Sequence, residues 1–336
     1  MNELNLIQKF FQPLAKTSTA SHNLSDDAAR FSINRNEELI VSTDTLVEDV
    51  HFLKSDGGFN IASKLLLTNL SDLAASGAKP LYYTLNFSKN KNLDQKFITD
   101  FCRGLSSIQK KFNLSLIGGD TVCSKKLFFS VTIFGTIKKG ESLLRSGAKS
   151  GDLIFVSGSI GDAFLGLNLK QKKDLSEKHL LSRHFSPTPR IELGKALLKS
   201  KISRCAIDVS DGLLSDLRHI CTSSKLDAEI HLEKIPISPE AKNFLQKNPG
   251  QKNPEIKLLD LISGGDDYEL IFTSDKKNLR KILDLQKSLK LDLTCIGTMK
   301  KPSGKTTIKS PGESHCITLL DSKQKKITIK KFGYEH

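Results

Sequence analysis

Aspartate residues recur in this sequence at the ends of apolar runs, next to Gly, Ser or Thr. They are Asp26 and Asp27 in "LSDDAA", Asp44 in "LIVSTDT", Asp72 in "NLSDLAASGA", Asp120 in "LSLIGGDT", and Asp208 and Asp211 in "AIDVSDGL". Carboxylate oxygens without an accompanying His or Cys suit a hard cation such as Mg²⁺. Any one of these residues could instead form a turn or cap a helix. The repeated pattern favours a shared metal-binding role.

Glycines and hydroxyl groups beside these acids could supply a phosphate site. Glycine lets backbone N–H groups approach a phosphate closely, and "GGD" at 118–120 and "SDG" at 210–212 both have this character. A helix beginning near Leu213 would place its N-terminus at the second of them, although an ordinary helix cap explains that segment too. The pattern predicts that phosphates bind beside the acids.

A nucleotide-binding loop of the Walker type is excluded by spacing. The segment "SGKTT" at 303–307 contains the required Lys, but the first Gly of the motif would fall at Met299, and Pro302 interrupts the loop. No G-x-G-x-x-G segment follows a predicted strand, and no protein-kinase catalytic loop is present. If the chain binds ATP, we expect it to do so through metal-binding aspartates.

Elements of an α/β fold must position these residues. Short apolar or β-branched runs predict strands at 39–42, 81–87, 127–137, 153–157 and 205–209. Helical periodicity predicts helices at 61–75, 93–111, 189–200, 213–221 and 276–289. In an open α/β sheet, ligands bind outside the carboxyl ends of the strands, where several of the aspartates lie. The polar stretch 243–257, with Pro249, Gly250 and Pro254, predicts a surface loop.

The chain length predicts two domains, because 336 residues exceed the usual size of one hydrophobic core. The Gly-rich, charged segment 138–152 separates two α/β halves. We therefore expect an N-terminal domain over 1–138 and a C-terminal domain over 139–336.

Composition limits the classes of partner. The formal charge is +14, but 42 Lys stand against 9 Arg, whereas forked recognition of phosphates and bases is mainly the work of Arg. We therefore expect no nucleic-acid partner. No apolar run is long enough to cross a membrane, the N-terminus lacks a signal-peptide pattern, and the six scattered cysteines form no CxxC pair. These features predict a cytoplasmic protein with reduced thiols and no membrane partner.

The ordered motifs resemble the thiamine-monophosphate kinase family, of the aminoimidazole-ribonucleotide-synthetase-like superfamily. The matching blocks are "DDAARF", "STDTLVEDVHF", "NLSDLAASGAKP", "LIGGDT", "RSGAKSGDLIFVSGSIGDAFLGL", "DVSDGLLSDLRHI", "SGGDDYELIFT" and "FGYEH". They span nearly the whole chain. The resemblance implies a fold like aminoimidazole ribonucleotide synthetase, with an N-terminal domain that contributes to a homodimer interface and a C-terminal domain covering the nucleotide and substrate cleft.

The same resemblance implies roles for individual residues. Several Mg²⁺ ions would be held by Asp27, Ser42, Thr43, Asp44, Asp72, Asp120, Asp208 and Asp211, among which Asp44, Asp120 and Asp211 would be catalytic. ATP would contact Gly119, Arg145 and Ser210, and thiamine monophosphate would contact His51, Asp266 and Tyr334. His51 could instead be a packed core residue, and Tyr334 could belong to a frayed tail.

Three positions depart from the usual family pattern. Ser25 and Asp49 stand where the family generally has Gly, and Asp266 stands where it has Glu. These changes leave the expected metal ligands in place. They make the expected contacts with the acceptor substrate less secure than those with the metal.

The implied reaction joins two anions, because the acceptor is itself a phosphate. Its oxygen is already ionised at neutral pH, so direct in-line transfer assisted by Mg²⁺ needs neither a strong general base nor a covalent nucleophile. One alternative is a selenophosphate synthetase or a purine-biosynthetic synthetase of the same superfamily, but no N-terminal reactive Cys is present. A basic nucleic-acid-binding protein is the alternative from a different class.

Overall fold

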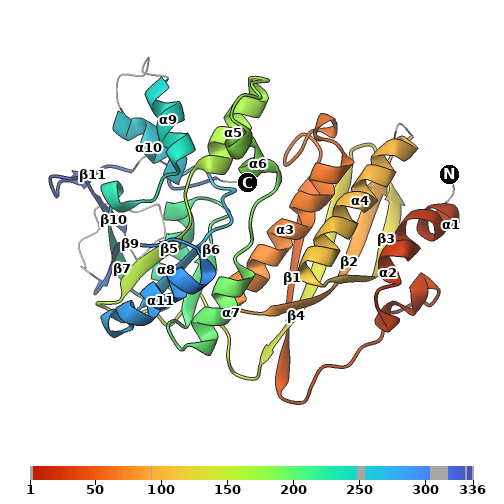
Figure 1. Cartoon of the computed structure of the whole chain (residues 1–336), viewed down its shortest axis with the longest axis horizontal. Coiled ribbons are helices and arrows are strands. Elements are labelled where there is room, and N and C mark those ends of the chain that lie inside the picture. Colours follow the sequence, from red (N-terminus) through yellow and green to blue (C-terminus); the bar gives the residue numbers. More distant parts are fainter. Residues whose placement is uncertain (1–2, 92, 248–253, 303–316, 330, 335–336) are drawn as a thin grey trace. The chain divides into compact units, whose positions relative to one another are not determined.

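The protein is described by a computed structural model that covers residues 3–91, 93–247, 254–302, 317–329 and 331–334 (Figure 1). The chain divides into two compact units. The N-terminal unit comprises Met1–Leu73 and Ala78–Glu141, and the C-terminal unit comprises Ala74–Gly77 and Ser142–His336. Each unit is described below by itself.

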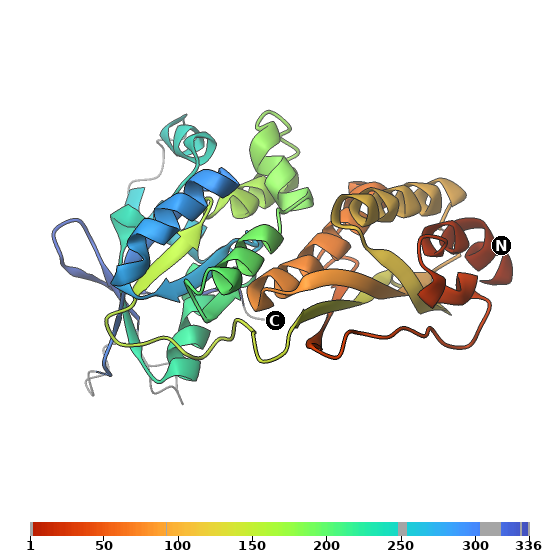
Figure 2. The same ribbon diagram turned by 60° about the horizontal axis from the view of Figure 1, so that its bottom comes forward.

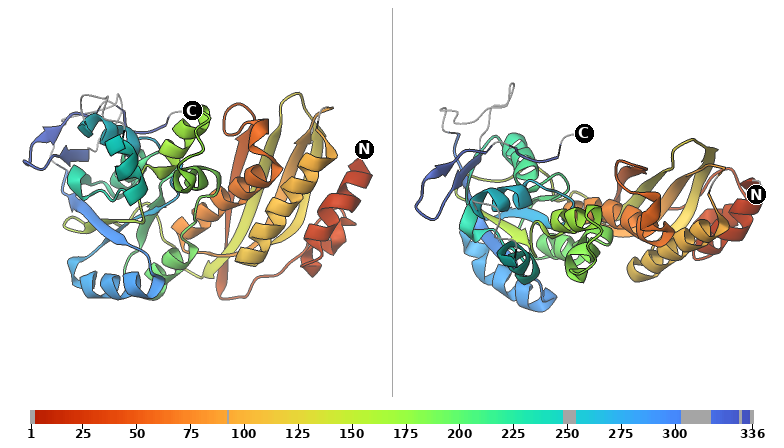
Figure 3. Two further views of the ribbon diagram at one scale, coloured as in Figure 1. Left: turned by 45° about the horizontal axis from the view of Figure 1, so that its top comes forward. Right: turned by 90° about the horizontal axis from the view of Figure 1, so that it is seen from above.

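The N-terminal unit contains a four-stranded sheet with helices on one face (Figures 2 and 3). Its strands are β1 (Glu37–Val47), β2 (Lys79–Lys89), β3 (Ser115–Cys123) and β4 (Phe128–Lys138), in the order β1-β4-β2-β3. Strand β4 runs antiparallel to β1 and β2, and β2 runs parallel to β3. The helices are α1 (Glu3–Leu6), α2 (Gln12–Ala15), α3 (Gly58–Ser76) and α4 (Gln95–Phe112), with a π-helical turn at Ile7–Phe11 and 3₁₀ turns at Thr19–Leu24 and Lys54–Asp56.

Alternation along β4 decides which face of this sheet is buried. Phe129, Val131 and Ile133 are fully buried, whereas Ser130 and Thr132 between them remain partly exposed. The ring of Phe129 packs against those of Phe87 on β2 and Phe101 on α4, with centroids 5.0 and 4.6 Å apart. This aromatic core fixes α4 on the sheet and leaves the opposite face without helices.

The C-terminal unit contains a seven-stranded mixed sheet in the order β11-β10-β7-β9-β5-β8-β6. Its strands are β5 (Leu153–Ser157), β6 (Cys205–Asp208), β7 (Asp227–His231), β8 (Leu270–Ser274), β9 (Leu293–Lys300), β10 (Ile317–Leu320) and β11 (Lys326–Ile327). Its helices are α5 (Asp162–Gln171), α6 (Lys178–Phe185), α7 (Ile191–Lys199), α8 (Leu213–Ser224), α9 (Pro239–Lys247), α10 (Pro254–Ile262) and α11 (Leu279–Leu289), with 3₁₀ turns at Leu232–Lys234 and Lys276–Asn278. Strand β10 pairs in parallel with β7, and β5 lies antiparallel between β8 and β9.

Helix α8 covers the central strands of this unit. Its Leu213, Leu214 and Leu217 belong to one buried cluster with Val156 of β5 and Ile271 of β8. A second cluster joins α5, α6, α9 and α10. The "SDG" segment lies between the end of β6 at Asp208 and the start of α8 at Leu213.

The fold confirms the predicted α/β class with two domains, and each predicted strand or helix overlaps an observed one. The predicted loop at 243–257 is wrong at both ends, because α9 runs to Lys247 and α10 begins at Pro254, and residues 248–253 between them lie outside the described residues. Proline is well tolerated at the first position of a helix, so Pro254 can start α10. The "SGKTT" segment lies outside the described residues. Within those residues no helix could span a membrane, and the five described cysteines form no disulfide with one another.

Candidate active site

Strand β1 and helix α3 bring three of the predicted metal ligands together. Ser42 and Asp44 occupy alternate positions of β1, so they share the face of the sheet that α3 covers. The Ser42 hydroxyl donates to Asp72 Oδ2 on α3 at 2.5 Å, and the Asp44 N–H donates to Asn69 Oδ1 at 3.2 Å. The result is a pair of neighbouring carboxylates with a hydroxyl group beside them.

The electrostatics of this pair favour a cation. Burial, and to a smaller extent the charge of Asp72, together raise the pKa of Asp44 to about 7. Two carboxylates that disfavour each other's ionised form are stabilised by a cation between or beside them. Three convergent acidic, His or Cys side chains are found nowhere among the described residues. A magnesium site does not need them, since Mg²⁺ commonly takes one or two carboxylates together with water and substrate phosphates.

Thr43 points away from this pair. Its hydroxyl lies 2.9 Å from the hydroxyl of Thr132 on β4, on the opposite face of the sheet. The structure therefore does not bring the Thr43 side chain to Asp44 and Asp72.

Strand β3 forms a second acidic site at the other edge of the same sheet. A cavity of about 210 Å³ is lined by Asp26, Asp27, Gly119 and Asp120, among other residues. Gly119 has a φ of +153°, and a Cβ atom there would collide with the Leu85 carbonyl oxygen. The glycine therefore allows β3 to approach β2 while turning backbone groups toward the cavity.

The two acidic sites of the N-terminal unit are separate in one chain. Strands β1 and β3 are opposite edges of the sheet, three strand spacings apart, which amounts to about 14 Å. Mg²⁺ binds its ligands at about 2.0–2.1 Å, so Asp44 and Asp120 of one chain cannot ligate the same ion. Within one chain, the structure therefore places Asp44 and Asp72 in one acidic site and Asp27 and Asp120 in another.

His51 lies just beyond the end of β1 and is partly buried. The Val47 N–H donates to its Nδ1 at 3.1 Å. Because Nδ1 accepts this hydrogen bond, the neutral ring carries its proton on Nε2, where it can donate. Asp49 nearby has a φ of +66°, which explains why the family generally has Gly here and why Asp, which tolerates this conformation, can replace it.

In the C-terminal unit, a buried carboxylate that the sequence analysis missed organises the "SDG" loop. Asp216 Oδ2 accepts hydrogen bonds from the N–H groups of Ser210, Asp211 and Gly212 at 3.0, 3.1 and 3.2 Å. Burial raises the pKa of Asp216 to about 8, and the charges of Asp208 and Asp211 add to the shift. The three N–H groups are therefore used within the protein. The available signal was the second acid of "SDGLLSD", one turn into the helix.

The loop that carries Asp266 packs directly on this segment. The Asp266 N–H donates to the Ser210 carbonyl at 2.7 Å, and the Tyr268 N–H donates to the Val209 carbonyl at 2.8 Å. Asp266 Oδ2 also lies 3.3 Å from Nδ1 of the buried His184. Asp266 is predicted to contact the acceptor substrate. The structure thus brings it next to Asp211, the predicted metal ligand, and Ser210, the predicted ATP contact.

Tyr334 reaches the same loop from the C-terminal end of the chain. Its N–H donates to the Asp211 carbonyl at 2.8 Å, so the alternative of a frayed tail is wrong for this residue. Arg145 lies elsewhere, since its carbonyl accepts from Cys205 Sγ and Ser224 Oγ at the far end of α8. A helix of this length spans about 17 Å, so the structure does not bring the backbone of Arg145 near Ser210.

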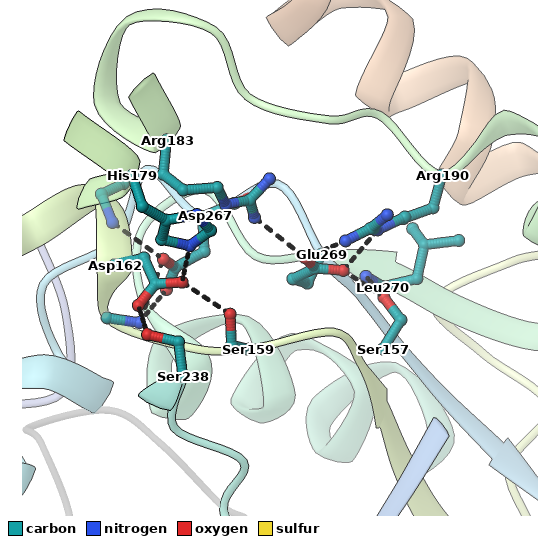
Figure 4. A network of polar contacts seen from close by, with 12 residues as sticks. Ser157, Ser159, Asp162, His179, Arg183, Arg190, Ser238, Asp267, Glu269 and Leu270 are labelled. Atoms are coloured by element: carbon teal, nitrogen blue, oxygen red, sulfur yellow. Dashed lines mark hydrogen bonds and ion pairs between the residues drawn. The ribbon is translucent and has the colours of Figure 1, made fainter. Parts of the chain in front are cut away.

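A buried ionic network supports the Asp266 loop (Figure 4). Glu269 is fully buried and accepts from Arg183 at 2.9 Å, from Arg190 Nε at 2.6 Å and from the Ser157 hydroxyl at 2.6 Å. Asp267 accepts from the Gly161 N–H at 2.9 Å, and burial holds its pKa well above the ordinary value. These two anchors lie on either side of Tyr268 and immediately follow Asp266, so they fix the backbone that presents Asp266.

Comparison with known proteins assigns the chain to a family. Residues 25–137 match the model of the AIR synthase related protein N-terminal domain, and residues 149–309 match that of its C-terminal domain. A thiamine-monophosphate kinase of Buchnera aphidicola subsp. Schizaphis graminum is 40% identical over 100% of this chain and 98% of its own.

Solved structures agree with this assignment. The thiamine-monophosphate kinase of Stenotrophomonas maltophilia K279a is 36% identical, with a TM-score of 0.76 over 88% of this chain and 89% of that one. The structure of AaThiL complexed with AMPPCP and TMP is 28% identical, with a TM-score of 0.74 over 99% of this chain and 96% of that one.

Proposed function

The chain belongs to the thiamine-monophosphate kinases of the AIR synthase related family, and on this premise we propose that its paired aspartates bind Mg²⁺ for phosphoryl transfer. The activity is the ATP-dependent phosphorylation of thiamine monophosphate to thiamine diphosphate. This sets aside the sister synthetases of the superfamily as alternatives. The observation that carries the metal proposal is the partly buried Asp44 beside Asp72.

Each group of site residues has a distinct task in this proposal. In the N-terminal unit Mg²⁺ would be held by Asp27, Ser42, Thr43, Asp44, Asp72 and Asp120, and in the C-terminal unit by Asp208 and Asp211. Bound Mg²⁺ supplies positive charge to the phosphate oxygens of donor and acceptor, which lowers their repulsion. Gly119, Arg145 and Ser210 would contact ATP. The Thr43 side chain points to the other face of the sheet, so Thr43 would take part only through its backbone.

The residues predicted to contact the acceptor substrate, His51, Asp266 and Tyr334, would orient thiamine monophosphate. The Nε2–H of His51 is suited to donate to a phosphate oxygen, because its Nδ1 is already an acceptor. Asp266 and the aromatic ring of Tyr334 are suited to the cationic and aromatic parts of the thiamine moiety. No side chain has to remove a proton from the acceptor phosphate, since that group is ionised at neutral pH.

The pKa of Asp44 offers a test of the metal proposal that does not depend on turnover. The folded-state pKa of about 7 lies above the ordinary value of 3.8 for Asp, so the folded protein binds the proton more tightly than the unfolded chain does. Without divalent metal, the free energy of unfolding should therefore fall as the pH rises from about 4 to 7. The fall should reach as much as about 4 kcal/mol, since one pKa unit is worth about 1.4 kcal/mol.

Adding Mg²⁺ should reverse this loss at pH 8, because the metal binds the ionised carboxylate. Urea unfolding at several pH values, with and without Mg²⁺, measures both effects. In Asp44→Asn both the Asp44 share of the pH dependence and most of the Mg²⁺ response should disappear. An unchanged Mg²⁺ response in that variant would contradict metal binding at Asp44.

We also propose that the protein is a homodimer formed through the N-terminal unit. The face of its sheet opposite α3 and α4 carries exposed apolar side chains of β1, with Leu39 38% and Val41 50% exposed. An antiparallel sheet can expose one face to water, but the side chains on that face are normally polar. A second copy of the chain would remove these side chains from water.

Val41→Asp should therefore shift the protein from dimer to monomer, because it places a charge in the centre of the proposed interface. Leu283→Asp on α11 is a matched control, since Leu283 is 56% exposed in the C-terminal unit. Sedimentation velocity reports the mass of each variant. A Val41→Asp variant with the mass of the wild type would count against this interface.

A further inference from the structure

The last described residues of the chain are held on one face of α8. The guanidinium carbon of Arg218 lies 4.9 Å from the centre of the Phe332 ring, within the range of a cation–π contact. Phe332 also packs, partly buried, against the apolar cluster to which α8 contributes. Arg218 follows Ser215 by three positions, so the two side chains share a face of the helix.

Close backbone contacts continue from this anchor to the "SDG" loop. Gly333 is buried, and a Cβ atom there would lie 2.5 Å from the Asp211 carbonyl oxygen and 2.6 Å from Ser215 Cβ. Only glycine permits this approach. The next residue, Tyr334, donates its N–H to the same carbonyl at 2.8 Å while its side chain remains 47% exposed. The backbone of Tyr334 is thus fixed, while part of its side chain faces solvent.

We propose that Arg218 is a positioning residue for the acceptor substrate. Its cation–π contact holds Phe332 in place. Phe332 in turn positions the next two residues, Gly333 and Tyr334, against the Asp211 carbonyl. Arg218 itself does not have to touch either substrate. The consequence for catalysis rests on the proposed role of Tyr334 in binding thiamine monophosphate, whereas the anchoring of the segment does not.

Arg218→Met tests this role, because Met keeps an aliphatic stem on α8 and removes the cation. The KM for thiamine monophosphate should rise about 2- to 10-fold, the range expected from loss of a cation–π contact. The KM for ATP and kcat should change less, since Asp216 holds the Ser210–Gly212 loop independently. Arg218→Lys should recover part of the loss, because Lys can also place a cation over the ring.

Hydrogen exchange of the Tyr334 amide gives a readout without turnover. It should be faster in Arg218→Met than in the wild type and close to the wild type in Arg218→Lys. Arg103→Met is the matched control, since Arg103 makes a similar contact with Phe59 in the N-terminal unit, 5.5 Å from the ring centre. That variant should change neither the exchange of Tyr334 nor the KM for thiamine monophosphate.

A double-variant cycle separates anchoring from other roles of Arg218. Gly333→Ala should displace the segment by itself, so adding Arg218→Met should raise the KM for thiamine monophosphate little further. Fully additive effects, or unchanged exchange at Tyr334 in Arg218→Met, would overturn the proposal. Faster exchange with an unchanged KM would leave the anchoring intact and remove Tyr334 from the acceptor site instead.

Discussion

Asp44→Asn and Asp120→Asn should each lower kcat by about 100-fold or more while the fold survives. Asn has nearly the same shape as Asp, but it lacks the negative charge with which each residue would help to hold Mg²⁺ in the proposed mechanism. Asp44 shares its site with Asp72, and Asp120 shares a cavity with Asp26 and Asp27, so each substitution removes one carboxylate from an acidic group. The change is measured by steady-state kinetics at saturating ATP, thiamine monophosphate and Mg²⁺.

Asp100→Asn provides the matched control for these variants. Asp100 lies on α4 of the same unit and pairs with Lys96 and Arg103, both at 3.1 Å, on the surface. Its replacement should leave kcat close to that of the wild type, because exposed ion pairs contribute little. Circular dichroism of all three variants checks that the fold is retained. Wild-type turnover in Asp44→Asn or Asp120→Asn would remove that residue from the metal site.

Glu269→Gln should lower the free energy of unfolding by about 3–5 kcal/mol, the largest effect on stability that we expect. Glu269 is fully buried between the buried Arg183 and the partly buried Arg190, and loss of its charge removes the carboxylate with which both guanidinium groups pair. The loop bearing Asp266 should loosen with it, since Glu269 and Asp267 anchor that loop. Urea unfolding measures the loss of stability.

Glu192→Gln is the corresponding surface control. Glu192 pairs with Lys195 three residues later on α7 at 3.0 Å, and its side chain is 71% exposed. This variant should unfold at nearly the same urea concentration as the wild type. If Glu269→Gln were as stable as the wild type, the proposal that the buried network fixes the Asp266 loop would be wrong.

Much of the fold and the chemical character of the site could be predicted from local sequence. The alternation Phe129, Val131, Ile133 marks β4 as a strand with one buried face, and the acids at the ends of apolar runs predict the metal ligands that we propose. These signals depend on a few neighbouring residues, and so they survive without knowledge of the tertiary structure.

Other features depend on contacts between distant segments and could not be predicted. The order β1-β4-β2-β3 separates Asp44 from Asp120, and nothing in the periodicity of the strands specifies that order. Asp216 and Glu269 also looked like ordinary charged residues, because their partners come from loops and helices elsewhere in the chain. Asp49 is an intermediate case: a left-handed conformation could be suspected from the glycine usual at that position.

We propose that a phosphate, held by the acidic site with Mg²⁺, accepts the γ-phosphoryl group of ATP. The most direct test is an assay of the purified protein with ATP and Mg²⁺, with either thiamine monophosphate or free thiamine as acceptor, and with chromatographic detection of the products. We expect thiamine diphosphate from thiamine monophosphate, loss of that product when EDTA removes the metal, and little reaction of free thiamine. Phosphorylation or pyrophosphorylation of free thiamine at a comparable rate would contradict the assignment of a phosphate acceptor.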